Sequence, residues 1–320
     1  MSRWNIKTPK KAIEWILKPG DLHSEDIEMA GFYVSDTVKY GVDEENGFFL
    51  MHHPVFPTLR KHNNNTHGSY QLDITPEFMP AILVNGKEIK EELKKVTLDG
   101  TLKLNTEAEG LKITHHCFPS TELRATYELV TVENASGKTV ELSFTTPDEV
   151  YVHEELGCKG ICITEVFHDA EEVTLEDGET YIYGIAITGR LANEEPEFDD
   201  PKAELDNRYR NIVRLTDPMK IDTGNDLLDT MFTFAKIRGG ESVFDTMTGL
   251  MHGPGGYSYY AATWCNDQVE YAGPYFAYTG DEDLIEASYN AYKMYTPFMS
   301  KAYTARVSTA KKASRTVRPL

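Results

Sequence analysis

The residues best suited to chemistry lie in a glycine-rich, aromatic stretch between positions 232 and 278. Its pattern indicates a helix, a Gly/Pro-rich loop and a second helix that opens at Asn266 and Asp267 and carries Gln268, Glu270 and Tyr271 in its first turns. Aromatic rings stack on the apolar faces of sugar rings, and carboxylates and amides exchange directional hydrogen bonds with hydroxyls. This combination favours a carbohydrate site at the top of a helical hairpin.

Each of these residues also has a purely structural interpretation. Asn266 and Asp267 could cap the second helix by accepting hydrogen bonds from its first amides, and the neighbouring tyrosines could be packing residues. His252, beside the loop, is either a proton carrier or a solvated loop histidine. Arg238 and Glu241 lie three residues apart in a predicted helix, which is typical of a surface ion pair.

Length and composition exclude some classes of function. The chain has 320 residues, 40% of them hydrophobic, which is enough for two domains with cores. Its formal net charge of −19 disfavours nucleic acid as a partner and favours a neutral or cationic small ligand. The N-terminus resembles neither a secretory signal nor a membrane span, and no apolar run of about eighteen residues occurs elsewhere. We therefore expect a cytoplasmic protein that does not bind membranes.

Cysteine spacing gives no reason to expect a metal or a cofactor. The four cysteines include one C-x3-C pair, Cys158 and Cys162, with no second pair to complete a zinc site. His115, His116 and Cys117 are consecutive in a strand pattern, so their side chains alternate between faces and cannot all bind one ion. Histidines also flank an Asn-rich loop between positions 52 and 67, which either reaches a neighbouring site or is simply solvated.

Short alternating apolar segments dominate the chain from residue 21 to residue 192. Turn signals recur between them at Asn85-Gly86, Asp99-Gly100, residues 134–137 and Asp177-Gly178. Many short strands at hairpin spacing predict an antiparallel β-sandwich as the N-terminal domain. Before it, we expect residues 1–20 to be an extension with a short helix over positions 10–17.

The periodicity changes after the sandwich. Residues 193–222 are acidic and punctuated by proline, which indicates a linker, and positions 201–209 within it are compatible with a helix. Residues 223–300 have helical periodicity, with Thr223 or Asn225 as a cap, a helix through Ala235, and a further helix after Asp281. Residues 301–320 contain six Lys or Arg and no acid. We expect this tail to be foreign to the domain, by a frameshift or an artificial end; a basic docking tail is the alternative.

A β-sandwich followed by helical hairpins resembles the glycosidases and sugar phosphorylases built on an (α/α)6 barrel, among them glucoamylases, trehalases, rhamnosidases and debranching-type α-glucosidases. The segment Gly249 to Tyr271, GLMHGPGGYSYYAATWCNDQVEY, is similar to their first-hairpin loops. The resemblance implies a multidomain protein: an antiparallel β-sandwich followed by the α-hairpin start of an (α/α)6 barrel.

The same resemblance implies roles for individual residues. Trp264 and Asp267 look like the pair that contacts the sugar at the reacting subsite, and Asp267 is the catalytic candidate. In rhamnosidases a glutamate acts as general acid four residues before the tryptophan, but here that position is Tyr260. The candidate substrate-binding residues are Trp264, Asn266, Tyr259, Tyr260, His252 and Glu270.

Hydrolysis of a glycosidic bond needs two carboxyl groups, and in the glucoamylase- and trehalase-like enzymes these come from later hairpins. A complete barrel needs roughly 200 residues, but fewer than 100 follow position 222. We therefore expect a truncated, inactive glycoside hydrolase-like chain that self-associates through exposed apolar faces. The alternatives are a non-catalytic carbohydrate-binding or scaffold protein and a phosphorylase-like enzyme.

Overall fold

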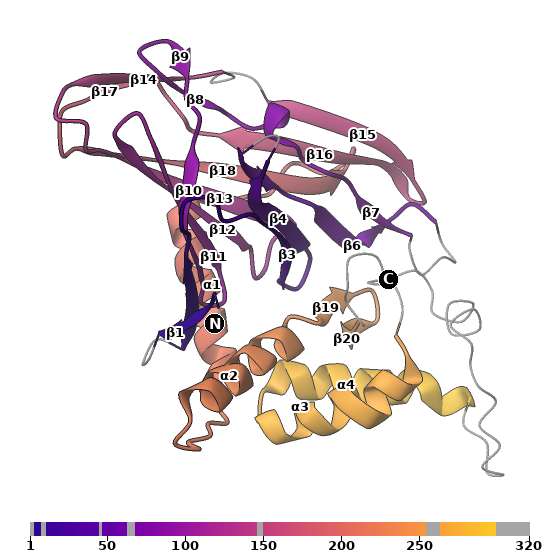
Figure 1. The fold of residues 1–320 in the computed structure, drawn as a ribbon. Coiled ribbons are helices and arrows are strands. Elements are labelled where there is room, and N and C mark those ends of the chain that lie inside the picture. The colour runs from indigo at the N-terminus through magenta and orange to yellow at the C-terminus, as the bar shows by residue number, and fades with distance from the viewer. Residues whose placement is uncertain are drawn as a thin grey trace.

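The computed structural model describes residues 3–7, 11–44, 47–62, 68–145, 150–253 and 263–298. Most of this chain is an antiparallel β-sandwich, and the helices gather at one end of it (Figure 1). The predicted sandwich is therefore confirmed. The predicted tail, 301–320, lies outside the described residues.

The largest sheet has nine antiparallel strands. It runs from the two N-terminal strands through five central strands to a final hairpin. In spatial order the strands are β1 (Asn5–Lys7), β2 (Ala12–Ile16), β10 (Glu92–Leu98), β11 (Leu102–Ala108), β12 (Leu111–Pro119), β13 (Ala125–Asn134), β18 (Thr180–Leu191), β16 (Gly160–His168) and β15 (Tyr151–Gly157).

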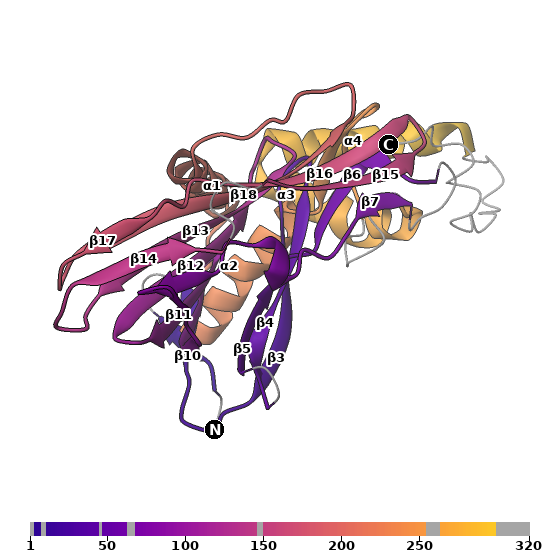
Figure 2. The same ribbon diagram turned by 90° about the horizontal axis from the view of Figure 1, so that it is seen from above.

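Two smaller sheets cover one face of this large sheet, and Figure 2 shows the layers from above. The five-stranded sheet contributes Val38 and Tyr40 to a core shared with Leu104 of β11. The four-stranded sheet contributes Val84 to a second core shared with Ile113 of β12. The five-stranded sheet comprises β3 (His23–Ala30), β4 (Ser35–Asp43), β5 (Gly47–Met51), β6 (Pro54–Arg60) and β7 (Ser69–Gln71). The four-stranded sheet comprises β17 (Val173–Leu175), β14 (Val140–Phe144), β8 (Ile82–Val84) and β9 (Lys87–Glu88), and a short 3-10 helix, η1 (Pro76–Phe78), precedes β8.

The predicted turns lie where the glycines indicate. Gly86, Gly100, Gly137 and Gly178 all have positive φ, between 76° and 94°. Glycine adopts this conformation without the steric cost that a Cβ atom imposes.

The helix predicted over positions 10–17 is wrong, because these residues include strand β2. β2 pairs with β10 on one side and with β1 on the other. A helix this short is not stable in isolation, whereas the edge of β10 offers a full set of backbone partners and the core accepts Trp15, which is 2% exposed. The N-terminal residues thus belong to the sandwich.

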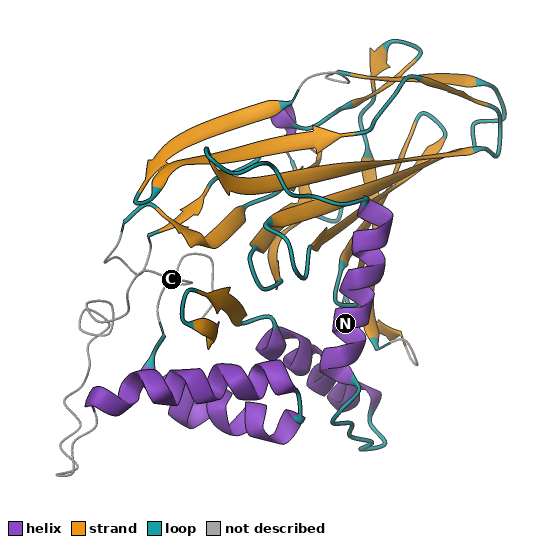
Figure 3. Ribbon diagram, turned by 180° about the vertical axis from the view of Figure 1, so that it is seen from behind, coloured by secondary structure: helices purple, strands orange, loops and turns teal. Residues whose placement is uncertain are grey.

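The acidic segment after the sandwich contains α1 (Pro201–Thr216). This helix extends well beyond positions 201–209, which the sequence indicated as compatible with a helix. The Asp200 carboxylate caps it by accepting from the Ala203 amide at 3.0 Å. Leu205 packs against Phe118 and Tyr127 on the other face of the large sheet, and Figure 3 shows α1 alongside the strands. The segment is therefore a packed element of the fold.

The helical end consists of a β-hairpin and three further helices. The predicted Asn225 cap is confirmed, since its side chain accepts from the Leu227 and Leu228 amides. A π-helical segment, η2 (Asp267–Ala272), leads into the second of these helices. No helix in the described ranges combines the length and apolar character needed to cross a bilayer. The elements are α2 (Asp226–Gly240), β19 (Val243–Thr246), β20 (Gly249–His252), α3 (Gly273–Thr279), α4 (Glu282–Tyr295) and a terminal 3-10 turn, η3 (Thr296–Phe298).

Candidate functional site

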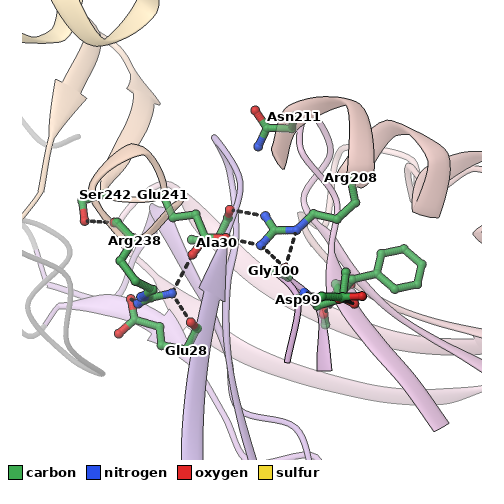
Figure 4. Close-up of polar contacts among 12 residues, drawn as sticks. Glu28, Ala30, Asp99, Gly100, Arg208, Asn211, Arg238, Glu241 and Ser242 are labelled. Carbon is green, nitrogen blue, oxygen red and sulfur yellow. Dashed lines mark hydrogen bonds and ion pairs between the residues drawn. The ribbon is translucent and has the colours of Figure 1, made fainter. Parts of the chain in front are cut away.

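A buried arginine of α1 holds the junction between the sandwich and the helices. The Arg208 side chain is 0% exposed, and its guanidinium donates to the Gly100 carbonyl at 2.7 and 3.1 Å and to the Ala30 carbonyl at 3.0 Å. It also forms an ion pair with Glu241, the residue that follows α2 (Figure 4). One side chain thus joins α1 to the end of α2, to the end of β3 and to the turn at Gly100.

The second oxygen of Glu241 extends this network to the surface. Arg238 Nη1 lies 2.6 Å from Glu241 Oε2, and Arg238 also contacts Glu28 of β3 (Figure 4). The Glu241 side chain is only 2% exposed. The prediction of a surface ion pair is therefore wrong for Glu241, whose charge lies in the interior between two guanidinium groups.

Arg214 fixes the last helix to the same junction. Its guanidinium pairs with Asp281 and lies 3.1 Å from Asp283 Oδ2. Asp281 also caps α4, accepting from the Leu284 amide at 3.0 Å. The guanidinium lies 5.9 Å from the centre of the Phe32 ring. The start of α4 is thereby positioned beside a loop of the sandwich.

These contacts frame a cavity of about 480 Å³ between the sandwich and the helical end, which we call the junction cavity. The loop before β4 forms one wall, where Gly31 approaches Ser120 so closely that a Cβ atom would lie 1.9 Å from the Ser120 carbonyl oxygen. The β19–β20 hairpin and α4 form the other walls. The lining residues are Phe32, Tyr33, Glu122, Asp245, Gly249, Leu250, Asp283 and Glu286.

Two cavity residues hold its walls together across 212 positions of sequence. The Tyr33 hydroxyl donates to Asp245 Oδ2 at 2.5 Å, and the Asp245 amide donates to the Phe32 carbonyl at 3.0 Å. The hydrogen bond to Asp245, assisted by burial, raises the pKa of Tyr33 to about 12. Tyr33 therefore remains a neutral donor at neutral pH.

The predicted carbohydrate motif, Gly249 to Tyr271, begins in the cavity wall. Hydrogen bonds join its first residues to its last ones. Gln268 Nε2 lies 2.6 Å from His252 Nδ1, and the Thr263 hydroxyl donates to the His252 carbonyl at 3.3 Å. The Tyr295 hydroxyl of α4 donates to the Thr263 carbonyl at 2.5 Å. Gln268 is 0% exposed, so its amide anchors the π-helical segment to β20.

The predicted site residues lie around these hydrogen-bonded ends. His252 is mostly buried, and this burial lowers its pKa to about 4, so it is neutral at physiological pH. Trp264 is half-buried, and its carbonyl accepts from the Gln268 amide at 3.2 Å. Asn266 and Glu270 are exposed. Tyr259 and Tyr260 lie outside the described residues.

Asp267 lies at the start of the π-helical segment and is partly buried. Burial raises its pKa, and the neighbouring Glu270 raises it further. The capping interpretation is wrong for this helix start, because Asn266 already has helical backbone angles and its side chain makes no cap hydrogen bond. A helical residue cannot act as the extended cap.

Periodicity and spacing do not identify Tyr33, Glu122 or Asp245 as cavity residues. Each comes from a turn or hairpin whose position depends on contacts made more than 80 residues away in sequence. The one local indication among the lining residues is the glycine at position 249, whose φ of 94° favours glycine.

One group in the described part of the chain has the composition and proximity of a metal site. It consists of His52, Cys117 and Glu128, all buried between the two sheets of the sandwich. None of the three lines the junction cavity. The two features are therefore separate.

A scan of the chain against protein-family models gives no match, and a search of the curated proteins gives no relative.

Proposed function

We propose that the chain binds carbohydrate in the junction cavity, and that α2, α3 and α4 correspond to the opening hairpins of a glycosidase-type (α/α)6 barrel. The observation that carries the proposal is the composition of the cavity, where aromatic rings and carboxylates face one space at a domain junction. Small-ligand sites occur preferentially at such junctions and measure about 300–1,000 Å³.

The cavity wall offers both kinds of contact that sugars need. Phe32 and Tyr33 supply aromatic surface for the apolar face of a pyranose ring. Glu122, Asp245 and Glu286 supply carboxylates, each of which accepts hydrogen bonds from hydroxyl groups. A charge-assisted hydrogen bond contributes about 1.5–3 kcal/mol.

The charge of the cavity favours a neutral sugar over an anionic ligand. Four of its lining residues are acids, and its described lining includes no lysine or arginine. A phosphorylase needs a basic phosphate pocket, so this wall supports the phosphorylase alternative less well than simple sugar binding.

Helix positions support the barrel correspondence. α3 and α4 are joined by only Gly280 and Asp281, and so short a connection makes two helices antiparallel neighbours. The apolar face of α2 is exposed, with Leu227 at 61% and Met231 at 60%, as expected of a helix that packs against further helices.

Asp267, the catalytic candidate predicted from the sequence, is not among the residues that line the junction cavity. Its raised pKa suits a carboxyl group that handles protons, but hydrolysis needs a pair of carboxyl groups flanking the scissile bond, and Asp267 does not face the cavity in which we propose that the sugar binds. We expect the 320-residue chain to bind sugars without hydrolysing them. Turnover of an aryl glycoside that Asp267→Asn abolishes would contradict this expectation.

Isothermal titration with methyl glucoside, glucose disaccharides and longer oligosaccharides tests binding. We expect saturable binding of at least one sugar, weakened about tenfold by Asp245→Asn, which corresponds to about 1.4 kcal/mol. Glu141→Gln is the matched control, because Glu141 is an exposed acid on β14, outside the cavity. Binding that is equal in both variants would place the site elsewhere, as in the scaffold alternative, and no binding would refute the proposal.

A further inference from the structure

A line of alternating acids and histidines crosses the space between the two sheets of the sandwich. We call it the inter-sheet cluster; it consists of Asp36, His52, Glu128, His115 and Glu91. Asp36 Oδ2 lies 2.7 Å from His52 Nδ1, and His52 Nε2 lies 3.4 Å from Glu128 Oε2. His115 then bridges Glu128 Oε1 at 2.6 Å and Glu91 Oε2 at 2.8 Å.

Strand register brings a cysteine to the centre of this line. Cys117 of β12 is paired directly with Glu128 of β13, so both side chains project from the same face of the nine-stranded sheet. His115 is two residues from Cys117 and therefore shares that face. His52 reaches the same point from the opposing sheet, where its backbone pairs with Ile74.

We propose that His52 Nε2, Cys117 Sγ and Glu128 Oε2 bind one divalent cation of the zinc class. The three residues are 0–4% exposed, and they offer ligand atoms that all lie within 4.8 Å of one another. Two ligands about 2.0–2.1 Å from a tetrahedral zinc lie roughly 3.4 Å apart. The 3.4 Å between His52 Nε2 and Glu128 Oε2 already has this value.

The neighbours of the three ligands orient them for a metal. Asp36 accepts a hydrogen bond from His52 Nδ1, so a metal that displaces the Nε2 proton meets an imidazole whose lone pair is directed toward Glu128 and Cys117. Metal-bound histidines usually have such a carboxylate partner. The Thr126 hydroxyl holds the same Asp36 oxygen at 2.7 Å, and His115 occupies the other oxygen of Glu128.

The donor set selects the class of ion. Nitrogen, thiolate sulfur and one carboxylate oxygen suit zinc or its substitute cobalt, whereas magnesium and calcium require oxygen ligands. The ion would join β12 and β13 to the five-stranded sheet, which is a structural role. Because all three ligands are buried, the ion enters as the chain folds, and its binding energy contributes to folding.

Refolding the full chain from guanidinium with Co²⁺, and separately with Zn²⁺ or EDTA, tests the proposal. We expect one cation per chain after desalting, a thiolate-to-cobalt charge-transfer band, and a higher unfolding midpoint with Zn²⁺ than with EDTA. Cys117→Ser should lose the band completely. Cys162→Ser is the matched control, since Cys162 is also a buried free cysteine of a strand in the large sheet, and it should keep the band.

X-ray absorption on the unmodified cobalt- or zinc-loaded chain keeps the test decisive even where a variant does not fold. We expect one sulfur ligand at about 2.3 Å with nitrogen and oxygen ligands completing the shell. Metal content no higher than in the EDTA sample, a first shell without sulfur, or a band that persists in Cys117→Ser would overturn the proposal.

Discussion

Acidic side chains are treated in opposite ways in two regions of this molecule. In the inter-sheet cluster each carboxylate has an imidazole partner within 3.4 Å. In the junction cavity only Asp283, among the described lining acids, belongs to an ion pair. Removing one partner of a buried charge pair is costly to a fold, whereas carboxylates with spare hydrogen-bonding capacity remain available to a ligand.

Histidines show the same contrast. Burial alone would lower the pKa of His115, but Glu91 and Glu128 outweigh it and raise this pKa to about 10. His252, at the junction, has an amide partner in Gln268, and burial lowers its pKa to about 4. One region is built around charge and the other around a neutral ring.

The largest expected effect is the loss of a charge from the inter-sheet cluster. Glu128→Gln should lower the free energy of unfolding by about 3–5 kcal/mol, because it leaves buried imidazoles without their carboxylate. Asp245→Asn in the junction cavity should change it by no more than about 1 kcal/mol. Urea denaturation measures both.

Glu133→Gln is the control for this pair of variants. Glu133 lies on the same strand as Glu128, but its side chain is 43% exposed. We therefore expect Glu133→Gln to lower the free energy of unfolding by less than about 1 kcal/mol. Equal losses for Glu128→Gln and Asp245→Asn would remove the distinction between the two regions.

Breaking the junction should have the next largest effect. Arg208→Ala leaves the Glu241 charge in the interior and the Gly100 and Ala30 carbonyls without their donor. We therefore expect the free energy of unfolding to fall by about 3 kcal/mol. Sugar binding should weaken with it, since the same contacts place the cavity walls. Arg210→Ala, at an exposed position of α1, should change neither quantity. A stable Arg208→Ala chain with unchanged affinity would show that the network does not position the cavity.

The pH dependence of stability should show whether the fold holds His252 neutral. His252 has its pKa lowered from 6.5 to about 4 in the folded chain, so the unfolded chain binds this proton more tightly. Stability should therefore fall as the pH drops from about 6.5 to 4, by up to about 3 kcal/mol from this residue.

The measurement is urea unfolding of the unmodified chain and of His252→Gln at several pH values between 4 and 7. The difference in stability between the two chains should shrink as the pH falls, because the variant does not have to exclude this proton. A difference that is independent of pH would mean that His252 is not held neutral by the fold.

The smallest effect is expected from one hydroxyl of the cavity. Tyr33→Phe removes the donor to Asp245 Oδ2 and should cost about 1 kcal/mol of stability, because the pair is only partly buried. The same change frees Asp245 to accept from a ligand, so calorimetry should show a smaller loss of sugar affinity than for Asp245→Asn. A larger loss would indicate that Tyr33 itself contacts the sugar.

Local signals predicted the elements of the fold well. The sandwich strands, the glycine turns and the helix caps at Asn225 and Asp281 follow from residues within a few positions of each feature. Partners across the fold do not follow from such signals. Leu227 and Met231 have the spacing of a buried helix face but are exposed. Their spacing indicates an apolar face and does not indicate which element covers it.

The two candidate sites show which contacts could be predicted from the sequence and which could not. The sequence predicted that His116 and Cys117 point to opposite faces of the strand. This is confirmed, because His116 Nε2 lies 2.8 Å from the Thr101 hydroxyl on the other face of the sheet. The meeting of Cys117 with His52 and Glu128 depends on strand register and sheet stacking. The meeting of Tyr33 with Asp245 likewise depends on how the helical end docks.

The most direct test of the account is a crystal structure of the chain grown with a disaccharide that binds in calorimetry. We expect sugar density in the junction cavity, against the rings of Phe32 and Tyr33 and within hydrogen-bond distance of Asp245. Sugar bound only on the sandwich, away from Phe32, Tyr33 and Asp245, would contradict it.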